Sequence, residues 1–189
     1  SNLIVIAGKI NSEDSSDIEE KDQINVMHDL INRFKLHNKI RWIGKLLRKD
    51  KSGEIYRVVA DHKGIFVQCG LFEGFGLTVI ESMQSGLPTF ATLYGGPLEI
   101  IEDKKSGFLI DPIEEKESQK IILSFSDRCK KEPDYWNQIS ENGIKRVDST
   151  YNWDLHAHKL LSLAKIYGFW NYSTNIEMTE MNSYLDVIY

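Results

Sequence analysis

Short apolar runs alternate with amphipathic helical segments along this chain, and this alternation constrains its fold more than any other feature. Runs rich in apolar β-branched residues predict strands at residues 3–8, 40–43, 64–68, 89–92 and 107–110. Helical spacing of apolar residues predicts a helix after most of these strands, and three helices after the last one. Repeated strand–helix units predict an α/β fold with a doubly wound parallel sheet, which binds ligands outside the carboxyl ends of its strands.

The composition is that of a globular domain and argues against several classes of function. Of the 189 residues, 41% are hydrophobic and 27% are charged, which excludes a disordered chain and allows a sizeable core. The net charge of −5 is unfavourable for binding nucleic acid or an anionic membrane surface. Cys69 and Cys129 match no disulfide framework and no zinc pattern, so a reducing cytoplasm is the expected location.

A glycine-rich turn at residues 70–76 follows one predicted strand and opens a helix. Free backbone N–H groups at a helix start, combined with glycines that admit close approach, favour an anion such as phosphate. The Thr78 hydroxyl adds a donor, and Glu81 lies on the same helix face one turn further on. A carboxylate at that place suits a vicinal diol such as that of a ribose, and Glu73 would reach another part of the same ligand.

Each of these features also has a simpler structural interpretation. Glycine turns after strands are common, and a nicotinamide fingerprint would need a third glycine where Val79 stands. The loop at residues 95–97 either lines the same crevice or only starts a short helix. The basic residues of the loop 45–52 either meet phosphates or form a solvated surface. The five histidines are scattered and predict no metal site.

The chain resembles the C-terminal half of the retaining GT-B glycosyltransferases, and most closely the sucrose synthases. The spacing of Glu73 and Glu81 matches the E-x7-E motif of these enzymes. Similarity to sucrose synthases covers nearly the whole chain and is carried by residues 27–31, 41–43, 53–57, 64–68, 75–101, 106–108, 110–112, 167–170 and 184–186. It implies a Rossmann-like fold and an enzyme that interconverts sucrose and a nucleoside diphosphate with a nucleotide-glucose and fructose.

The resemblance also implies roles for individual residues. Glu73, the catalytic candidate, would bind the hydroxyls of the donor glucose. Thr78 would contact a phosphate, and Glu81 would bind the ribose diol. The family mechanism is a front-face displacement that needs no enzymic nucleophile, no metal and no other cofactor.

The backbone between the two glutamates would hold the sugar and the diphosphate of the donor. The residues that the resemblance assigns to this role are Phe75, Gly76 and Leu77.

The base of the nucleotide is left open by the sequence. Leu46 and Ser52 stand where plant sucrose synthases carry a Gln and an Asn near the base. Either UDP-glucose or ADP-glucose is therefore a possible donor. The Arg and Lys that clamp the diphosphate in the family would precede the first strand seen here, and neither Lys45 nor Arg48 occupies their positions.

The resemblance implies a nucleotide-sugar-binding domain at residues 1–172. The apolar pattern breaks at residues 171–175, and the helical spacing that follows predicts a tail helix at residues 173–189 that packs elsewhere. Because the chain opens inside a predicted strand, we expect a fragment that lacks the N-terminal half and is inactive alone, although a complete product is an alternative. Met181 and Leu185 of the tail would pack on the missing half.

Sucrose and fructose would bind through the missing N-terminal half, and a homo-oligomer is possible. The alternatives are a sucrose-phosphate synthase, another GT-B transferase, or a non-catalytic nucleotide-binding or assembly module.

Overall fold

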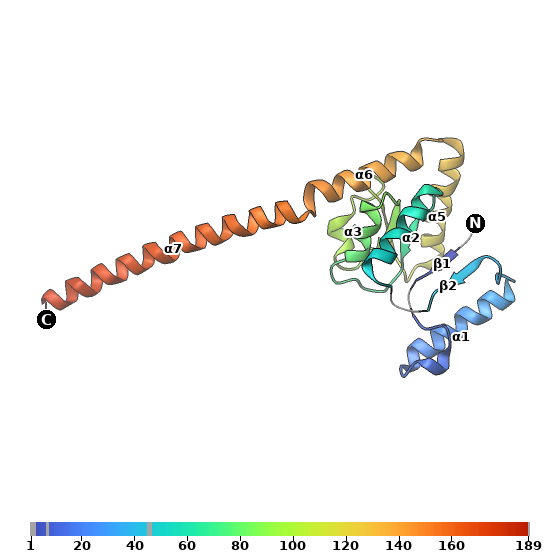
Figure 1. The fold of residues 1–189 in the computed structure, drawn as a ribbon, viewed down its shortest axis with the longest axis horizontal. Helices are drawn as coiled ribbons and strands as arrows, with labels where there is room; N and C mark the ends of the chain where they lie inside the picture. Colours follow the sequence, from blue (N-terminus) through green and yellow to red (C-terminus); the bar gives the residue numbers. More distant parts are fainter. Residues whose placement is uncertain (1–2, 7, 45–46, 189) are drawn as a thin grey trace. The chain divides into compact units, whose positions relative to one another are not determined.

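A computed structural model describes residues 3–6, 8–44 and 47–188 of the chain, with side chains for all of these except residues 49 and 175–188. Contacts within the chain divide it into two compact units, Ser1–Ile55 and Tyr56–Tyr189. Figure 1 shows the helices and strands in chain order, coloured from blue to red.

The first unit contains a two-stranded parallel sheet and a long helix. Its elements are β1 (Leu3–Val5), η1 (Ser12–Asp14), α1 (Ile18–Arg33), β2 (Ile40–Trp42) and the start of α2 (Lys49–Asp61). Asp17 caps α1, because its carboxylate accepts hydrogen bonds from the backbone N–H groups of Glu19 and Glu20 at 2.8 and 3.3 Å. The buried residues of α1 are Ile24 and Ile31, which are seven positions apart and therefore lie on one face.

The second unit is a three-stranded parallel sheet in the order β3-β4-β5, covered by helices. Its elements are β3 (Phe66–Gln68), α3 (Leu77–Gln84), β4 (Thr89–Thr92), α4 (Pro97–Ile100), β5 (Phe108–Ile110), α5 (Glu115–Lys131), α6 (Tyr135–Thr150) and α7 (Trp153–Ile188). All strand pairs of both units run parallel, as the alternation of strands and helices predicts. The expected α/β architecture is confirmed.

The central strand β4 is covered on both faces of the sheet. All four of its residues are buried, and neighbouring side chains point to opposite faces. Phe90 stacks on Phe108 with ring centroids 4.7 Å apart, and both rings meet Phe125 of α5 edge to face. Ala91 belongs to a separate buried cluster that includes residues of α3, α4 and α6: Val79, Met83, Ile100 and Val147.

Helix α2 begins earlier than the sequence predicts. The sequence predicts a loop at residues 45–52, yet the helix starts at Lys49. Apolar spacing becomes visible only from Ile55, because residues 49–54 at the start of α2 are polar apart from Gly53. Polar contacts hold this part of the helix, including an ion pair of 3.1 Å between Lys51 and Glu54.

Helix α7 is continuous, so the break expected at residues 171–175 is absent from its backbone. The polar residues there carry only modest helix penalties, and no proline interrupts the run. The Thr174 hydroxyl donates to the Trp170 carbonyl oxygen at 3.0 Å, so this polar side chain is hydrogen-bonded within the helix. The predicted tail residues Met181 and Leu185 lie outside the residues whose side chains are described.

Candidate functional site

The turn between β3 and α3 opens a helix whose start has no side-chain cap among the residues that the structure describes. Gly76 has a φ of 103°, in the left-handed region that a side chain rarely adopts, and Leu77 is the first helical residue. Within the described residues, no hydrogen bond inside the chain occupies the backbone N–H groups of Leu77, Thr78 and Val79. These three unpaired donors lie at the helix start where the sequence predicts an anion-binding group.

Glu73 is held in this turn by the loop that follows β4. Its backbone N–H donates to the Tyr94 carbonyl oxygen at 3.1 Å, and its own carbonyl oxygen accepts from Gly96 N–H at 2.8 Å. Glu73 and Gly95 form an isolated parallel bridge. A Cβ atom on Gly95 would overlap the Glu73 carbonyl oxygen, and one on Gly96 would overlap the Phe75 backbone. The two glycines therefore allow the two loops to lie in direct backbone contact.

The Glu73 carboxylate has a second support that sequence reasoning missed. Gln68, the last residue of β3, donates its side-chain N–H to Glu73 Oε2 at 3.3 Å. Gln68 Oε1 is buried and has no hydrogen-bond partner among the described residues. The signal available in the sequence is a polar residue at the end of an apolar strand, five positions before Glu73.

Glu81 lies beside a buried tyrosine. Glu81 is half-buried on α3, one turn after the exposed Thr78. Within the described part of the chain, neither the Glu81 nor the Thr78 side chain makes a hydrogen bond. The carboxylate oxygens of Glu81 and the hydroxyl of Thr78 are therefore unpaired there. Burial raises the pKa of the Tyr56 phenol, and the negative charge of Glu81 raises that pKa further. Tyr56 packs edge to face on Phe66 of β3 at 5.4 Å and was not predicted as a site residue.

A cavity of about 380 Å³ adjoins the turn. The ring of Phe75 meets the ring of Tyr151 edge to face across 6.4 Å at this cavity. Residues of both glycine loops line the cavity, together with α4 and the residue after α6: Gly74, Phe75, Gly95, Gly96, Leu98, Glu99, Ile100 and Tyr151. Glu73, Thr78 and Glu81 are not among its lining residues, so the cavity lies next to the predicted donor site.

The structure therefore brings six of the eight predicted site residues into one turn and the helix that it opens. These are Glu73, Phe75, Gly76, Leu77, Thr78 and Glu81. Phe75 and Leu77 are exposed, with 52% and 56% of their surface accessible. The other two candidates are those for the nucleotide base. Leu46 lies outside the described residues, and Ser52 is on α2 in the first unit, where its hydroxyl donates to the Arg48 carbonyl oxygen.

Two features are absent from the described residues. No group of three histidine, cysteine or acidic side chains is arranged there to bind a metal ion. Among the described helices, none combines the length and the apolar character required to cross a membrane.

Comparison with known proteins identifies the family. The profile of the family described as glycosyl transferases group 1 matches residues 1–146, which is more than half of the chain. The chain belongs to the group 1 glycosyltransferase family. This group 1 glycosyltransferase chain is 57% identical to a sucrose synthase of Melioribacter roseus over 189 residues, and 44% identical to sucrose synthase 2 of Pisum sativum over 188 residues. The alignments cover all of this chain but only 24% and 23% of those two relatives.

Solved structures agree with the family assignment at the level of the fold. The HepE protein of Anabaena in complex with UDP aligns with a TM-score of 0.66 and 18% identity, over 86% of this chain and 48% of that one. A sucrose-phosphate synthase from Thermosynechococcus elongatus aligns with a TM-score of 0.61 and 17% identity, over 88% of this chain and 45% of that one. These likenesses confirm the Rossmann-like fold of a GT-B glycosyltransferase half.

Proposed function

We propose that this group 1 glycosyltransferase chain is the donor-binding half of a sucrose synthase. The whole enzyme would interconvert sucrose and a nucleoside diphosphate with a nucleotide-glucose and fructose. One structural observation carries the proposal: Glu73 is held by backbone bonds to the loop 94–96, directly before the uncapped start of α3. The sequence identities with sucrose synthases support the choice of this reaction over other group 1 glycosyltransferases.

The proposed roles follow from the chemistry of each group. Glu73 would accept hydrogen bonds from the hydroxyls of the donor glucose. The backbone groups of residues 75–77 and the Thr78 hydroxyl would bind the sugar and the diphosphate, whose negative charge the start of α3 favours. Glu81 would accept hydrogen bonds from the ribose diol, because an unpaired carboxylate provides two acceptor oxygens.

Catalysis would be mainly electrostatic. Negative charge develops on the diphosphate as it leaves, and donors already aimed at it lower the barrier. The HepE protein of Anabaena was solved with UDP and with UDP-glucose, which supports a nucleotide-sugar as the class of ligand. UDP-glucose and ADP-glucose both fit the proposal, since the residues proposed for the base, Leu46 and Ser52, do not decide between them. We propose a cytoplasmic enzyme whose sucrose and fructose sites lie in the N-terminal half.

Calorimetric titration of the chain with UDP, ADP and their glucose conjugates tests this proposal. We predict saturable binding of UDP and UDP-glucose, of ADP and ADP-glucose, or of all four ligands. A Glu81→Ala substitution removes the proposed ribose acceptor, and loss of charged hydrogen bonds predicts a dissociation constant higher by about tenfold or more. Glu117→Ala is the matched control, because Glu117 is an exposed residue of α5 paired with Lys120.

The control variant should bind as the unmodified chain does. Equal affinity of the Glu81→Ala variant and the unmodified chain would contradict the assignment of Glu81. Absence of binding to all four ligands would contradict the proposed function of the chain.

A further inference from the structure

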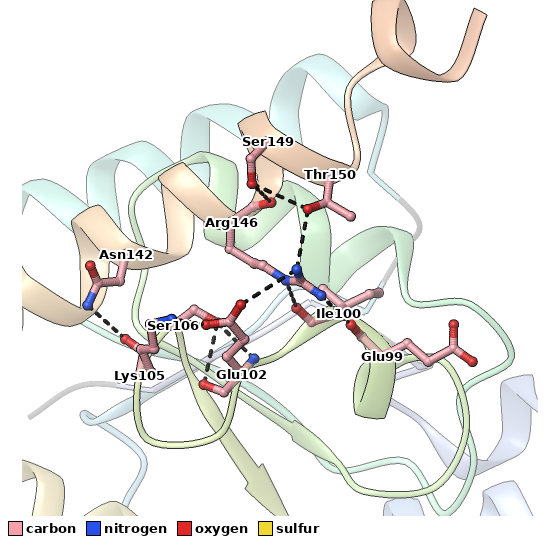
Figure 2. A network of polar contacts seen from close by, with 9 residues as sticks. All are labelled: Glu99, Ile100, Glu102, Lys105, Ser106, Asn142, Arg146, Ser149 and Thr150. Atoms are coloured by element: carbon pink, nitrogen blue, oxygen red, sulfur yellow. Dashed lines mark hydrogen bonds and ion pairs between the residues drawn. The ribbon is translucent and has the colours of Figure 1, made fainter. Parts of the chain in front are cut away.

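Arg146 of α6 binds the end of the short helix α4. Figure 2 shows its guanidinium pointing at the last carbonyl groups of that helix. Nε donates to the Ile100 carbonyl oxygen at 3.1 Å, and Nη2 donates to the Glu99 carbonyl oxygen at 2.8 Å. Nη1 lies 3.3 Å from Thr150 Oγ1 and 3.6 Å from a carboxylate oxygen of Glu102.

The bonds from Arg146 satisfy groups that α4 cannot satisfy by itself. The last four carbonyl groups of any helix lack partners within the helix, and α4 has only four residues, Pro97–Ile100. The rigid fork of an arginine binds two of these carbonyls at once, which a lysine cannot reproduce. Tyr151 adds a third donor, because its hydroxyl donates to the Glu99 carbonyl oxygen at 3.0 Å.

The opposite end of α4 is bonded to Glu73. Gly96 precedes Pro97 and donates its N–H to the Glu73 carbonyl oxygen at 2.8 Å, while Gly95 forms the bridge with Glu73. A displacement of α4 along or across its axis would therefore move Gly95 and Gly96, and with them Glu73. The short length of α4 leaves little room to absorb such a displacement.

We propose that Arg146 is a positioning residue for the donor sugar, acting through α4 and the loop 95–96 on the place of Glu73. This inference rests on the proposed function, which gives Glu73 its contact with the donor glucose. Arg146 itself touches neither the turn at residues 73–76 nor the first turn of α3 in the contacts described.

The nucleotide part of the site has an independent support. Ser82 Oγ of α3 lies 2.9 Å from Thr89 Oγ1 of β4, and the Gln84 side-chain N–H donates to Asp148 of α6 at 3.1 Å. These two contacts tie α3, and therefore Glu81, to elements other than α4. Loss of the Arg146 bonds should consequently weaken binding of the sugar and spare binding of the nucleoside diphosphate.

Calorimetry of an Arg146→Gln variant of the full chain tests the inference. The quantity measured is the ratio of the dissociation constant of the nucleotide-glucose to that of the nucleoside diphosphate, with UDP and ADP as the two nucleotides. We expect this ratio to rise by about fivefold relative to the unmodified chain, while the nucleoside diphosphate affinity changes less than about twofold. Arg146→Lys retains the charge but only some of the hydrogen bonds. Its ratio should therefore fall between that of the unmodified chain and that of Arg146→Gln.

Arg128→Gln is the matched control. Arg128 lies on α5 and donates to Glu132 at 3.0 Å, and none of its contacts among the described residues is with α4, so this substitution should leave the ratio unchanged. A purely structural role of Arg146 would lower both affinities together or neither of them, and either result would overturn the inference.

Amide hydrogen exchange provides a readout that needs no ligand. The Gly96 N–H, bonded to the Glu73 carbonyl oxygen, should exchange about tenfold faster in Arg146→Gln, while the amides of β4 exchange as before. Unchanged exchange at Gly96 would overturn the inference and leave the proposed function standing. A chain with no affinity for any of the nucleotides would overturn the proposed function, and with it the role of Arg146 in sugar binding.

Discussion

At the scale of single residues, the candidate site depends on two glycine loops in backbone contact. Gly95 has a φ of 101°, and a side chain there would both strain the backbone and overlap the Glu73 carbonyl oxygen. Gly74 lies in the adjoining turn, but a Cβ atom on it would meet nothing within 4 Å. Gly74 also lines the cavity beside this turn.

A Gly95→Ala substitution should lower the free energy of unfolding by about 2 kcal/mol, because both the strained φ and the overlap must be relieved. Gly74→Ala, the matched control, should change it by less than about 0.5 kcal/mol. Urea unfolding of the two variants measures both values. Equal stability of the two variants would show that the backbone contact between Gly95 and Glu73 is not what holds the loops together.

Sequence reasoning found the residues that are close in the chain and missed those that are not. Glu73, Thr78 and Glu81 fall within nine residues of one another, so their spacing alone predicts a common site. Arg146 lies 46 residues from its partner Ile100, and no local pattern links the two. Gln68 is closer to Glu73, but its role depends on the geometry of the turn between them.

At the scale of elements, strands and helices were predictable from the sequence where their apolar residues are regularly spaced. β4 was predicted with its observed bounds, Thr89–Thr92, and the structure buries all four of its residues. The predictions were wrong where polar residues continue a helix. The first turn of α2 lacks apolar spacing, and the polar residues at 171–175 do not interrupt α7.

The tail of α7 carries a prediction of its own. From Leu160 to Tyr172 its large apolar side chains are exposed, Trp170 with 62% of its surface accessible. We propose that residues 173–189 pack on the N-terminal half that the resemblance implies. Their amide protons should then exchange more slowly when that half is present than in the chain alone. Equal exchange rates in the two samples would contradict the proposed packing of the tail.

At the scale of the whole molecule, the proposed donor site belongs to one compact unit. Except for the two base candidates, its residues lie in the unit Tyr56–Tyr189, around the carboxyl ends of β3 and β4. Parallel sheets of this class bind ligands at such strand ends. The chain spans only 24% of the Melioribacter roseus sucrose synthase, so the acceptor site and the complete reaction belong to the proposal for the whole enzyme.

The central claim is that this unit binds a nucleotide-sugar between Glu73 and Glu81. The most direct test is a nuclear magnetic resonance titration of the labelled chain with UDP-glucose and ADP-glucose, following every assigned backbone amide. Our account predicts saturable shifts concentrated at residues 73–81 and 95–96, with the amides of α5 unaffected. Shifts that leave residues 73–81 unchanged, or that cluster on another part of the chain, would contradict it.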